Sequence, residues 1–168
     1  GEIKTNKGIP INNIKLNSSL FPFQQFIVKT ALNRGKYAIF ADCGLGKTFM
    51  QLEWAKQINI KTEKPVLILA PLAVTKQTIN EGLKFNIEVG EINSGKIEIT
   101  NYEQIDNISC NKYSGIVLDE SSILKNFNSK TKEKIIKEFK KTPYKLACTA
   151  TPSPNDPMEL GNHAEFLD

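Results

Sequence analysis

The chain has 168 residues, of which 40% are hydrophobic and 24% are charged, a composition typical of one globular domain that buries a core without disulfides or metals. Its formal net charge of +4 says little about partners. No apolar run approaches the roughly 18 residues of a membrane-spanning helix, and the amino terminus lacks a signal-peptide pattern. We therefore expect a cytoplasmic protein without membrane partners, in which Cys43, Cys110 and Cys148 are reduced thiols.

Residues 1–19 are polar and rich in Asn and Lys, and we interpret them as a trimmed terminus or a loosely attached arm. From residue 20 onward strand and helix patterns alternate, which predicts one α/β domain with a central, mostly parallel sheet and helices on both sides. The runs with strand character are residues 37–41, 66–70, 97–100, 115–119 and 144–149. The runs with a helical period are residues 23–33, 48–58, 73–85 and 129–139.

The segment between the first strand and the following helix is typical of a phosphate-binding loop. Its glycines allow backbone N–H groups to approach phosphates closely, although Ala41 stands where the strict pattern has glycine. Lys47 can reach the β and γ phosphates, the Thr48 hydroxyl can ligate Mg²⁺, and the next helix presents its positive N-terminus. We expect Cys43 to be a small residue of the loop without a chemical role. The expected nucleotide-binding residues of the loop are Asp42, Cys43, Gly44, Leu45, Gly46, Lys47 and Thr48.

The strand predicted at 115–119 ends in Asp119, and Glu120 follows it directly. In a parallel sheet this places both carboxylates at the edge where the phosphate loop lies. Asp119 can then hold the Mg²⁺ that Thr48 touches from the other side, while Glu120 can orient or deprotonate the attacking water. Adjacent Asp and Glu favour hydrolysis over transfer to a second substrate. We expect Lys47, Asp119 and Glu120 to be the catalytic residues of an ATP hydrolase that uses ATP and Mg²⁺.

Six segments, in order, resemble the motifs of the first RecA-like motor domain of superfamily 2 helicases, nearest to the SWI/SNF-type translocases and their phage relatives. In the first, Leu20-Phe21-Pro22-Phe23-Gln24, the resemblance implies that Gln24 reads the adenine edge, with Gln25 as a competing candidate. The phosphate loop is the second. Asp119-Glu120-Ser121-Ser122, followed by Leu124-Lys125-Asn126, resembles the DEAH-type motif. The resemblance implies a three-layer RecA-like P-loop NTPase domain over residues 20–168, in a bacterial or phage-infected host cell.

The three remaining segments concern nucleic acid and coupling. Leu69-Ala70-Pro71-Leu72 and Ile99-Thr100-Asn101-Tyr102-Glu103 resemble elements near the nucleic-acid backbone. They imply contacts from Pro71, Thr100, Asn101 and Tyr102, although Tyr102 could equally pack within a turn. Thr149-Ala150-Thr151-Pro152 resembles the motif that couples hydrolysis to strand movement. The family commonly has Ala-His after the two acids, so here Ser122 would contact the coupling residues Thr149, Ala150 and Thr151 through its hydroxyl.

The function implied is a nucleic-acid-dependent ATPase, a helicase or translocase acting on duplex DNA. Its second RecA-like domain would supply arginine fingers, and the only arginine here, Arg34, precedes the phosphate loop. Such a finger is worth ~10³ to 10⁵ in rate, so we expect the isolated domain to hydrolyse ATP weakly or not at all. A nucleotide-dependent scaffold and another P-loop phosphotransferase are the alternatives.

Lysine is concentrated late in the chain. Eight lysines stand against two acidic residues between positions 125 and 145, which indicates either a phosphate-facing patch or a solvated helix face. We predict that Trp54 is a core residue and that His163 is a surface or packing residue.

Overall fold

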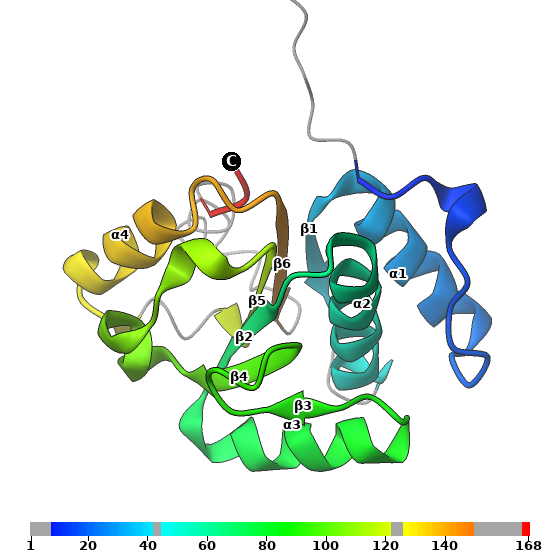
Figure 1. Ribbon diagram of the computed structural model, residues 1–168, viewed down its shortest axis with the longest axis horizontal. Coiled ribbons are helices and arrows are strands. Elements are labelled where there is room, and N and C mark those ends of the chain that lie inside the picture. Colours follow the sequence, from blue (N-terminus) through cyan, green and yellow to red (C-terminus); the bar gives the residue numbers. More distant parts are fainter. Residues whose placement is uncertain (1–7, 42–44, 122–125, 150–165) are drawn as a thin grey trace, which may run out of the picture.

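The computed structural model describes residues 8–41, 45–121, 126–149 and 166–168. Its centre is a six-stranded sheet in the order β1-β6-β5-β2-β4-β3, in which every neighbouring pair is parallel (Figure 1). Because all strands run the same way, their carboxyl ends meet at one edge of the sheet. The strands are β1 (Lys36–Phe40), β2 (Val66–Ala70), β3 (Val89–Gly90), β4 (Ile97–Asn101), β5 (Gly115–Asp119) and β6 (Tyr144–Thr149).

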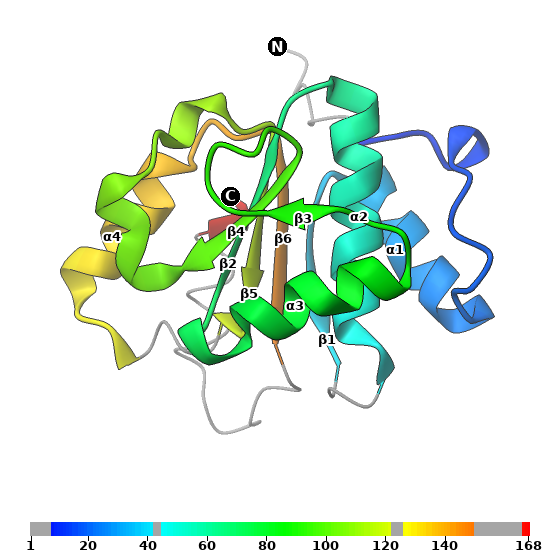
Figure 2. The same cartoon turned by 60° about the horizontal axis from the view of Figure 1, so that its bottom comes forward.

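Helices cover both faces of this sheet (Figures 1 and 2). One face carries α1 (Pro22–Arg34), α2 (Lys47–Thr62) and α3 (Leu72–Lys84). The other carries α4 (Ser129–Glu138) together with the 3-10 turns η3 (Tyr102–Asn107) and η4 (Cys110–Lys112). These three layers confirm the predicted α/β architecture.

The central strands are buried on both faces, which explains their continuous apolar sequence. Every residue of β2, β5 and β6 is buried. Alternate side chains enter two separate clusters: Ile68, Val117 and Leu146 pack under α1, α2 and α3. Leu67, Leu118 and Ala147 pack under α4 and the 3-10 turns. The sheet is therefore a rigid platform on which the carboxyl-edge residues stand.

Most predicted elements are confirmed, with differences at their ends. The predicted strands at 66–70, 115–119 and 144–149 coincide with β2, β5 and β6. Helix α2 continues beyond the predicted end at residue 58 to Thr62, where Glu63 closes it in a left-handed conformation and donates its backbone N–H to the Asn59 carbonyl. The two-residue strand β3 was not predicted, because Val89–Gly90 is too short for a periodic pattern.

Residues 8–19 differ from the expected loosely attached arm. The side chains of Ile9 and Ile14 are buried in the core beside α1, and the Ile9 N–H donates to the Leu32 carbonyl at 2.8 Å. A short 3-10 turn, η1 (Ile11–Asn13), lies between them, and the Asn17 N–H donates to Glu53 on α2 at 3.2 Å. Ile9 and Ile14, together with the partly buried Leu16, thus fasten this segment to the core.

Trp54 has no exposed surface, which confirms its predicted place in the core. Cys110 and Cys148 are buried free thiols, as expected, and burial together with the charge of Glu138 raises the pKa of Cys110 to about 11. Within the described ranges, none of the helices is long and apolar enough to cross a membrane. His163 lies outside the described residues.

Candidate active site

The site forms where three adjacent strands, β1, β6 and β5, end together at the lower edge of the sheet in Figure 2. The strand register pairs Phe40 with Thr149 and Asp119 with Cys148. The end of β1 therefore lies beside the end of β6, where the coupling motif begins, and β6 in turn lies beside the end of β5, which carries the acidic motif. Helix α2 starts at the same edge, so that its positive N-terminus faces this point.

The described part of the phosphate loop is built around Gly46, which caps the N-terminus of α2. Gly46 has φ +75°, a conformation that side chains rarely adopt, and a Cβ there would lie 2.2 Å from Gln24 Nε2. Both the backbone conformation and the close approach of Gln24 thus require glycine. Asp42, Cys43 and Gly44 lie outside the described residues.

Lys47, the first residue of α2, contacts both predicted catalytic acids. Its amine forms an ion pair with Glu120 and lies 3.6 Å from Asp119 Oδ1. The side chains of Lys47 and Asp119 are each 7% exposed, whereas that of Glu120 is 37% exposed. Glu120 also has φ +51°, a left-handed conformation that costs on the order of 1 kcal/mol or more outside glycine. Such strain in a residue that follows a buried strand is typical of functional sites.

Asp119 is held by two further residues that the sequence analysis missed. The Gln51 amide, from α2, donates to Asp119 Oδ1 at 2.8 Å. From the opposite face of the sheet, the Tyr102 hydroxyl donates to the Asp119 backbone carbonyl at 2.8 Å. Gln51 is four residues after Lys47, so helical spacing alone could have placed both side chains on one face of α2.

Gln24 braces the phosphate loop against α1. It is 5% exposed, its Nε2 donates to the Leu45 carbonyl at 2.9 Å, and its Oε1 accepts from the Phe21 N–H at 2.8 Å. One amide proton and one lone pair remain for a base edge, so its predicted adenine role stays a prediction. Gln25, the competing candidate, is half-buried and donates to the Leu20 carbonyl at 3.0 Å.

The end of β6 adjoins the start of the phosphate loop. The Ala41 N–H donates to the Thr149 carbonyl at 3.0 Å, and Ser121 Oγ donates to the Cys148 carbonyl at 3.4 Å. Thr149 Oγ1 is buried, and no residue in the described ranges hydrogen-bonds to it. The other coupling candidates, Ser122, Ala150 and Thr151, lie outside the described residues.

The candidates for nucleic-acid contact follow the next strands at the same edge. Pro71, Thr100 and Asn101 are partly exposed, and the register pairs Ala70 with Asn101. Thr100 and Asn101 line a hollow of about 400 Å³. Tyr102 differs, because its side chain is 1% exposed and its ring packs in the core at 5.9 Å from that of Phe127. Of its two predicted roles the structure gives Tyr102 the packing one.

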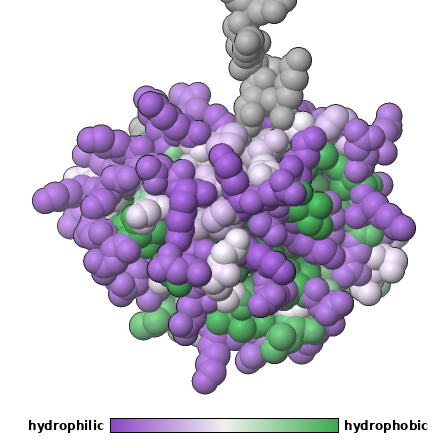
Figure 3. All heavy atoms as spheres, viewed as in Figure 1, coloured by the Kyte–Doolittle hydropathy of each residue, from purple (hydrophilic) through white to green (hydrophobic). Residues whose placement is uncertain are grey.

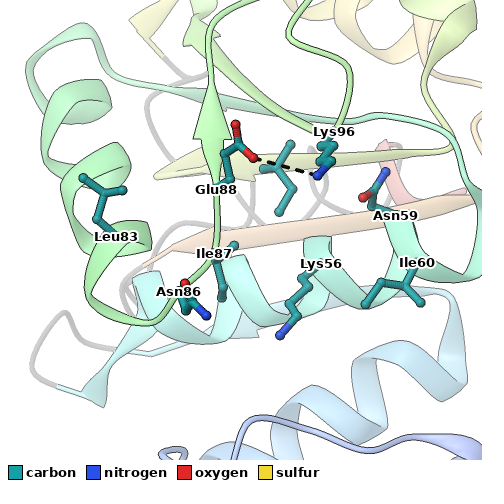
Figure 4. A pocket seen from close by; sticks show the side chains of 9 residues that line it. Lys56, Asn59, Ile60, Leu83, Asn86, Ile87, Glu88 and Lys96 are labelled. Carbon is teal, nitrogen blue, oxygen red and sulfur yellow. Dashed lines mark ion pairs between the residues drawn. The ribbon is translucent and has the colours of Figure 1, made fainter.

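Other surface features lie away from this edge. A hollow of about 380 Å³ lies near the carboxyl end of α2, where Glu88 and Lys96 form an exposed ion pair at 3.8 Å (Figure 4). Lys56 is the residue of α2 that lines this hollow nearest to Lys47, and the nine-residue step between them spans about 14 Å along the helix. Figure 3 shows hydrophilic side chains over most of the visible face, the α4 region included. On α4, Lys134 pairs with Asp106, and this hydrogen bond raises the pKa of Lys134.

Comparison with known proteins gives consistent matches. The family model described as type III restriction enzyme, res subunit, matches residues 17–154. Protein p41 of Acyrthosiphon pisum secondary endosymbiont phage 1 is 30% identical over 177 residues, which cover 88% of this chain and 38% of that protein. The chain therefore spans well under half the length of that relative.

Two solved structures share the fold. The Sulfolobus solfataricus SWI2/SNF2 ATPase core in complex with dsDNA has a TM-score of 0.77 and 24% identity over 91% of this chain and 36% of that one. The UvsW helicase from bacteriophage T4 has a TM-score of 0.78 and 12% identity over 96% of this chain and 67% of that one. The chain belongs to the family of the type III restriction enzyme res subunit, and it shares its fold with the SWI2/SNF2 ATPase core and the UvsW helicase, in agreement with the resemblance seen in its sequence.

Proposed function

We propose that the chain is the ATP-binding half of a nucleic-acid-dependent ATPase, which binds Mg-ATP through residues 41–48 and moves along duplex DNA when joined to a second RecA-like domain. The observation that carries this proposal is the meeting of Lys47, Asp119 and Glu120 beside the N-terminus of α2. One cation and two carboxylates at a helix N-terminus are suited to bind a triphosphate with its metal ion and to activate water.

Lys47 is the residue that would exchange partners when nucleotide binds. Its amine now neutralises Glu120, which carries one negative charge. A triphosphate carries more charge, and the N-terminus of α2 adds favourable backbone N–H groups. The amine would therefore move to the phosphates and release Glu120. The Glu120 carboxylate, being 37% exposed, would then be free to engage water.

The residues fit a magnesium ion that arrives with the nucleotide. Among the described residues, both contacts to the Asp119 carboxylate are made to Oδ1, which leaves Oδ2 as a hard oxygen donor. Thr48 adds a hydroxyl oxygen one residue after Lys47. Bound there, Mg²⁺ would neutralise charge on the phosphate oxygens. No group of three or more His, Cys, Asp or Glu side chains in the described ranges could hold a metal by itself, so phosphates and water would complete the coordination.

Hydrolysis needs a base near the γ phosphate, and Glu120 is the candidate. Water would attack the γ phosphorus while the bond to the β–γ bridging oxygen breaks. Its proton would pass to the Glu120 carboxylate, and ADP and phosphate would leave. Lys47 would hold the phosphates, and the backbone N–H groups of the loop would stabilise their charge.

A duplex DNA track is supported by two observations. The SWI2/SNF2 core that shares this fold is a complex with dsDNA. Pro71, Thr100 and Asn101 lie at the same sheet edge as the nucleotide site and are partly exposed. Contacts from such residues would reach the sugar-phosphate backbone and would not read sequence.

The test combines nucleotide binding with turnover. We expect this chain to bind a fluorescent ATP analogue in the presence of Mg²⁺, and Lys47→Ala to weaken that binding at least ~10-fold, since it removes the cation that holds the phosphates. Joined to the second RecA-like domain, the protein should hydrolyse ATP faster with duplex DNA than with single-stranded DNA or RNA. Glu120→Gln should then bind nucleotide but lose ~10² to 10⁴ in rate.

Each result has a definite meaning. No binding of the analogue by the wild-type chain would overturn the nucleotide-site assignment. Full turnover by Glu120→Gln would exclude Glu120 as the base. Tight binding with no hydrolysis in the joined protein, with any nucleic acid, would instead identify a nucleotide-dependent scaffold.

A further inference from the structure

Gln51 occupies an unusual position for a polar side chain. It lies on α2 with no exposed surface, and its neighbours Met50, Leu52 and Trp54 are core residues with no exposed surface either. Its Nε2 donates to Asp119 Oδ1 across 68 residues of sequence. The hydrogen bond therefore joins the helix that follows the phosphate loop directly to the acidic end of β5.

The other half of the same amide is unsatisfied. Gln51 Oε1 is buried, and nothing in the described part of the chain donates a hydrogen bond to it. A buried polar atom without a partner is destabilising, because it loses its hydrogen bonds to water and gains none in the protein. A methionine of similar length would fill this place without that cost, so packing does not explain an amide here. What the amide provides is a neutral donor to the Asp119 carboxylate.

The Asp119 carboxylate needs such a donor once nucleotide is present. Lys47 and Gln51 are one helical turn apart, and both approach the same oxygen, Oδ1, at 3.6 and 2.8 Å. When the Lys47 amine moves to the phosphates, Gln51 is the remaining side-chain donor to Oδ1 within the described ranges. The Tyr102 hydroxyl fixes only the backbone of Asp119, through its carbonyl oxygen.

We propose that Gln51 is a positioning residue for magnesium: it holds Asp119 Oδ1 so that Oδ2 points to the cation that accompanies ATP. This inference rests on the proposed function, because it assigns to Gln51 the orientation of a metal-ligating carboxylate. Partners that orient a ligating side chain typically change metal affinity by about 10- to 100-fold when they are removed.

The test measures how nucleotide binding depends on magnesium. In the 168-residue chain, a fluorescent ATP analogue is titrated in EDTA and at increasing Mg²⁺ concentrations. We expect Gln51→Met to raise the Mg²⁺ concentration for half-maximal binding about 10-fold or more, and to leave the affinity in EDTA unchanged. Gln77→Met is the matched control, because Gln77 is exposed on α3, and it should change neither value.

Two further measurements separate positioning from packing. Gln51→Met should leave the melting temperature nearly unchanged, because the loss of the hydrogen bond to Asp119 is offset by removal of the unpaired Oε1. In an Asp119→Asn background it should add no further magnesium effect, because Gln51 acts through that carboxylate. Should Gln51→Met fail to fold, Gln51→Asn, whose shorter amide cannot reach Asp119, takes its place.

The outcomes also distinguish the two proposals. Wild-type chain that binds no nucleotide at any Mg²⁺ concentration would remove the proposed function and the inference with it. Normal magnesium-dependent binding by wild type, with the same dependence in Gln51→Met, would overturn the role of Gln51 alone. An equal loss of affinity in EDTA and in Mg²⁺ would show that Gln51 supports packing and would likewise overturn it.

Discussion

Two of the buried carboxylates, those of Glu98 and Asp119, have different sets of hydrogen-bond partners. Glu98, on β4, is 1% exposed and accepts from the Tyr113 hydroxyl at 2.6 Å and from the Asn93 and Gly95 N–H groups at 3.0 and 2.9 Å. Lys112 adds an ion pair at 3.5 Å. Asp119, on β5, is 5% exposed and has the Gln51 hydrogen bond and the Lys47 ion pair, both on Oδ1.

The difference in pairing indicates that Glu98 supports the fold, whereas Asp119 retains an oxygen that can bind a ligand. Both oxygens of Glu98 are hydrogen-bonded, and its donors tie the turn before β4 to Tyr113, which lies two residues before β5. At Asp119, Oδ2 has no hydrogen bond from any described residue, and its neighbours Gln51 and Thr149 each bury one unpaired polar atom. The oxygens Gln51 Oε1 and Thr149 Oγ1 can therefore still accept hydrogen bonds at the carboxyl edge, as Asp119 Oδ2 can.

The largest expected effect is loss of stability at Glu98. Glu98→Ala leaves the Tyr113 hydroxyl and two backbone N–H groups without their acceptor, so we expect a loss of about 3 kcal/mol in the free energy of unfolding. Urea denaturation followed by circular dichroism measures it. Glu88→Ala is the control, since that side chain is 80% exposed, and it should stay within about 0.5 kcal/mol of wild type. Equal values for the two variants would contradict a supporting role for Glu98.

Asp119→Asn should have a smaller effect of opposite sign. It removes a buried charge that is only half paired, and the amide oxygen can still accept from Gln51, so we expect stability between unchanged and about 1 kcal/mol higher. The same urea titration measures it. Nucleotide affinity in Mg²⁺ should fall in this variant, while the urea titration shows that its fold is intact. A destabilisation as large as that of Glu98→Ala would erase the distinction between the two carboxylates.

The sequence predicted the residues around Asp119, but it did not predict the hydrogen-bond network of Glu98. Lys47, Asp119 and Glu120 were predicted because each follows or begins an element at a spacing that the chemistry of a phosphate site demands. Strand β5, which ends in Asp119, and its neighbour β6 were predicted with their observed ends, since a strand buried on both faces is a continuous apolar run.

What the sequence did not predict depends on contacts between distant segments. The hydrogen-bond donors to Glu98 include Asn93, 5 residues before it, and Tyr113, 15 residues after it. No periodic sequence pattern predicts such a network. The sequence could not decide whether Tyr102 contacts nucleic acid or packs within a turn, because its burial depends on the packing of η3 against the sheet. Ile9 and Ile14 lie in a short segment without a helix or strand period, so their docking on α1 also required the folded structure.

The smallest expected effect is the pH dependence of the Glu98 contribution. Burial alone would raise the pKa of Glu98, but the hydrogen bonds from Tyr113, Asn93 and Gly95, with the charge of Lys112, lower it below its ordinary value of 4.5. A lowered pKa means that the unfolded chain binds the proton first as the pH falls. The stability that Glu98 provides as a carboxylate is therefore fully present above pH 4.5 and is lost as the pH falls through the folded-state pKa.

Comparison of wild type with Glu98→Gln between pH 7 and pH 3 measures this contribution. The difference in free energy of unfolding should be constant down to about pH 5 and should shrink below it, because the protonated Glu98 and the glutamine then carry the same charge. Glu88→Gln, the exposed control, should show no such convergence. A difference that stays constant to pH 3 would mean that Glu98 acts through the shape of its hydrogen bonds alone, and that its charge contributes nothing to the contrast with Asp119.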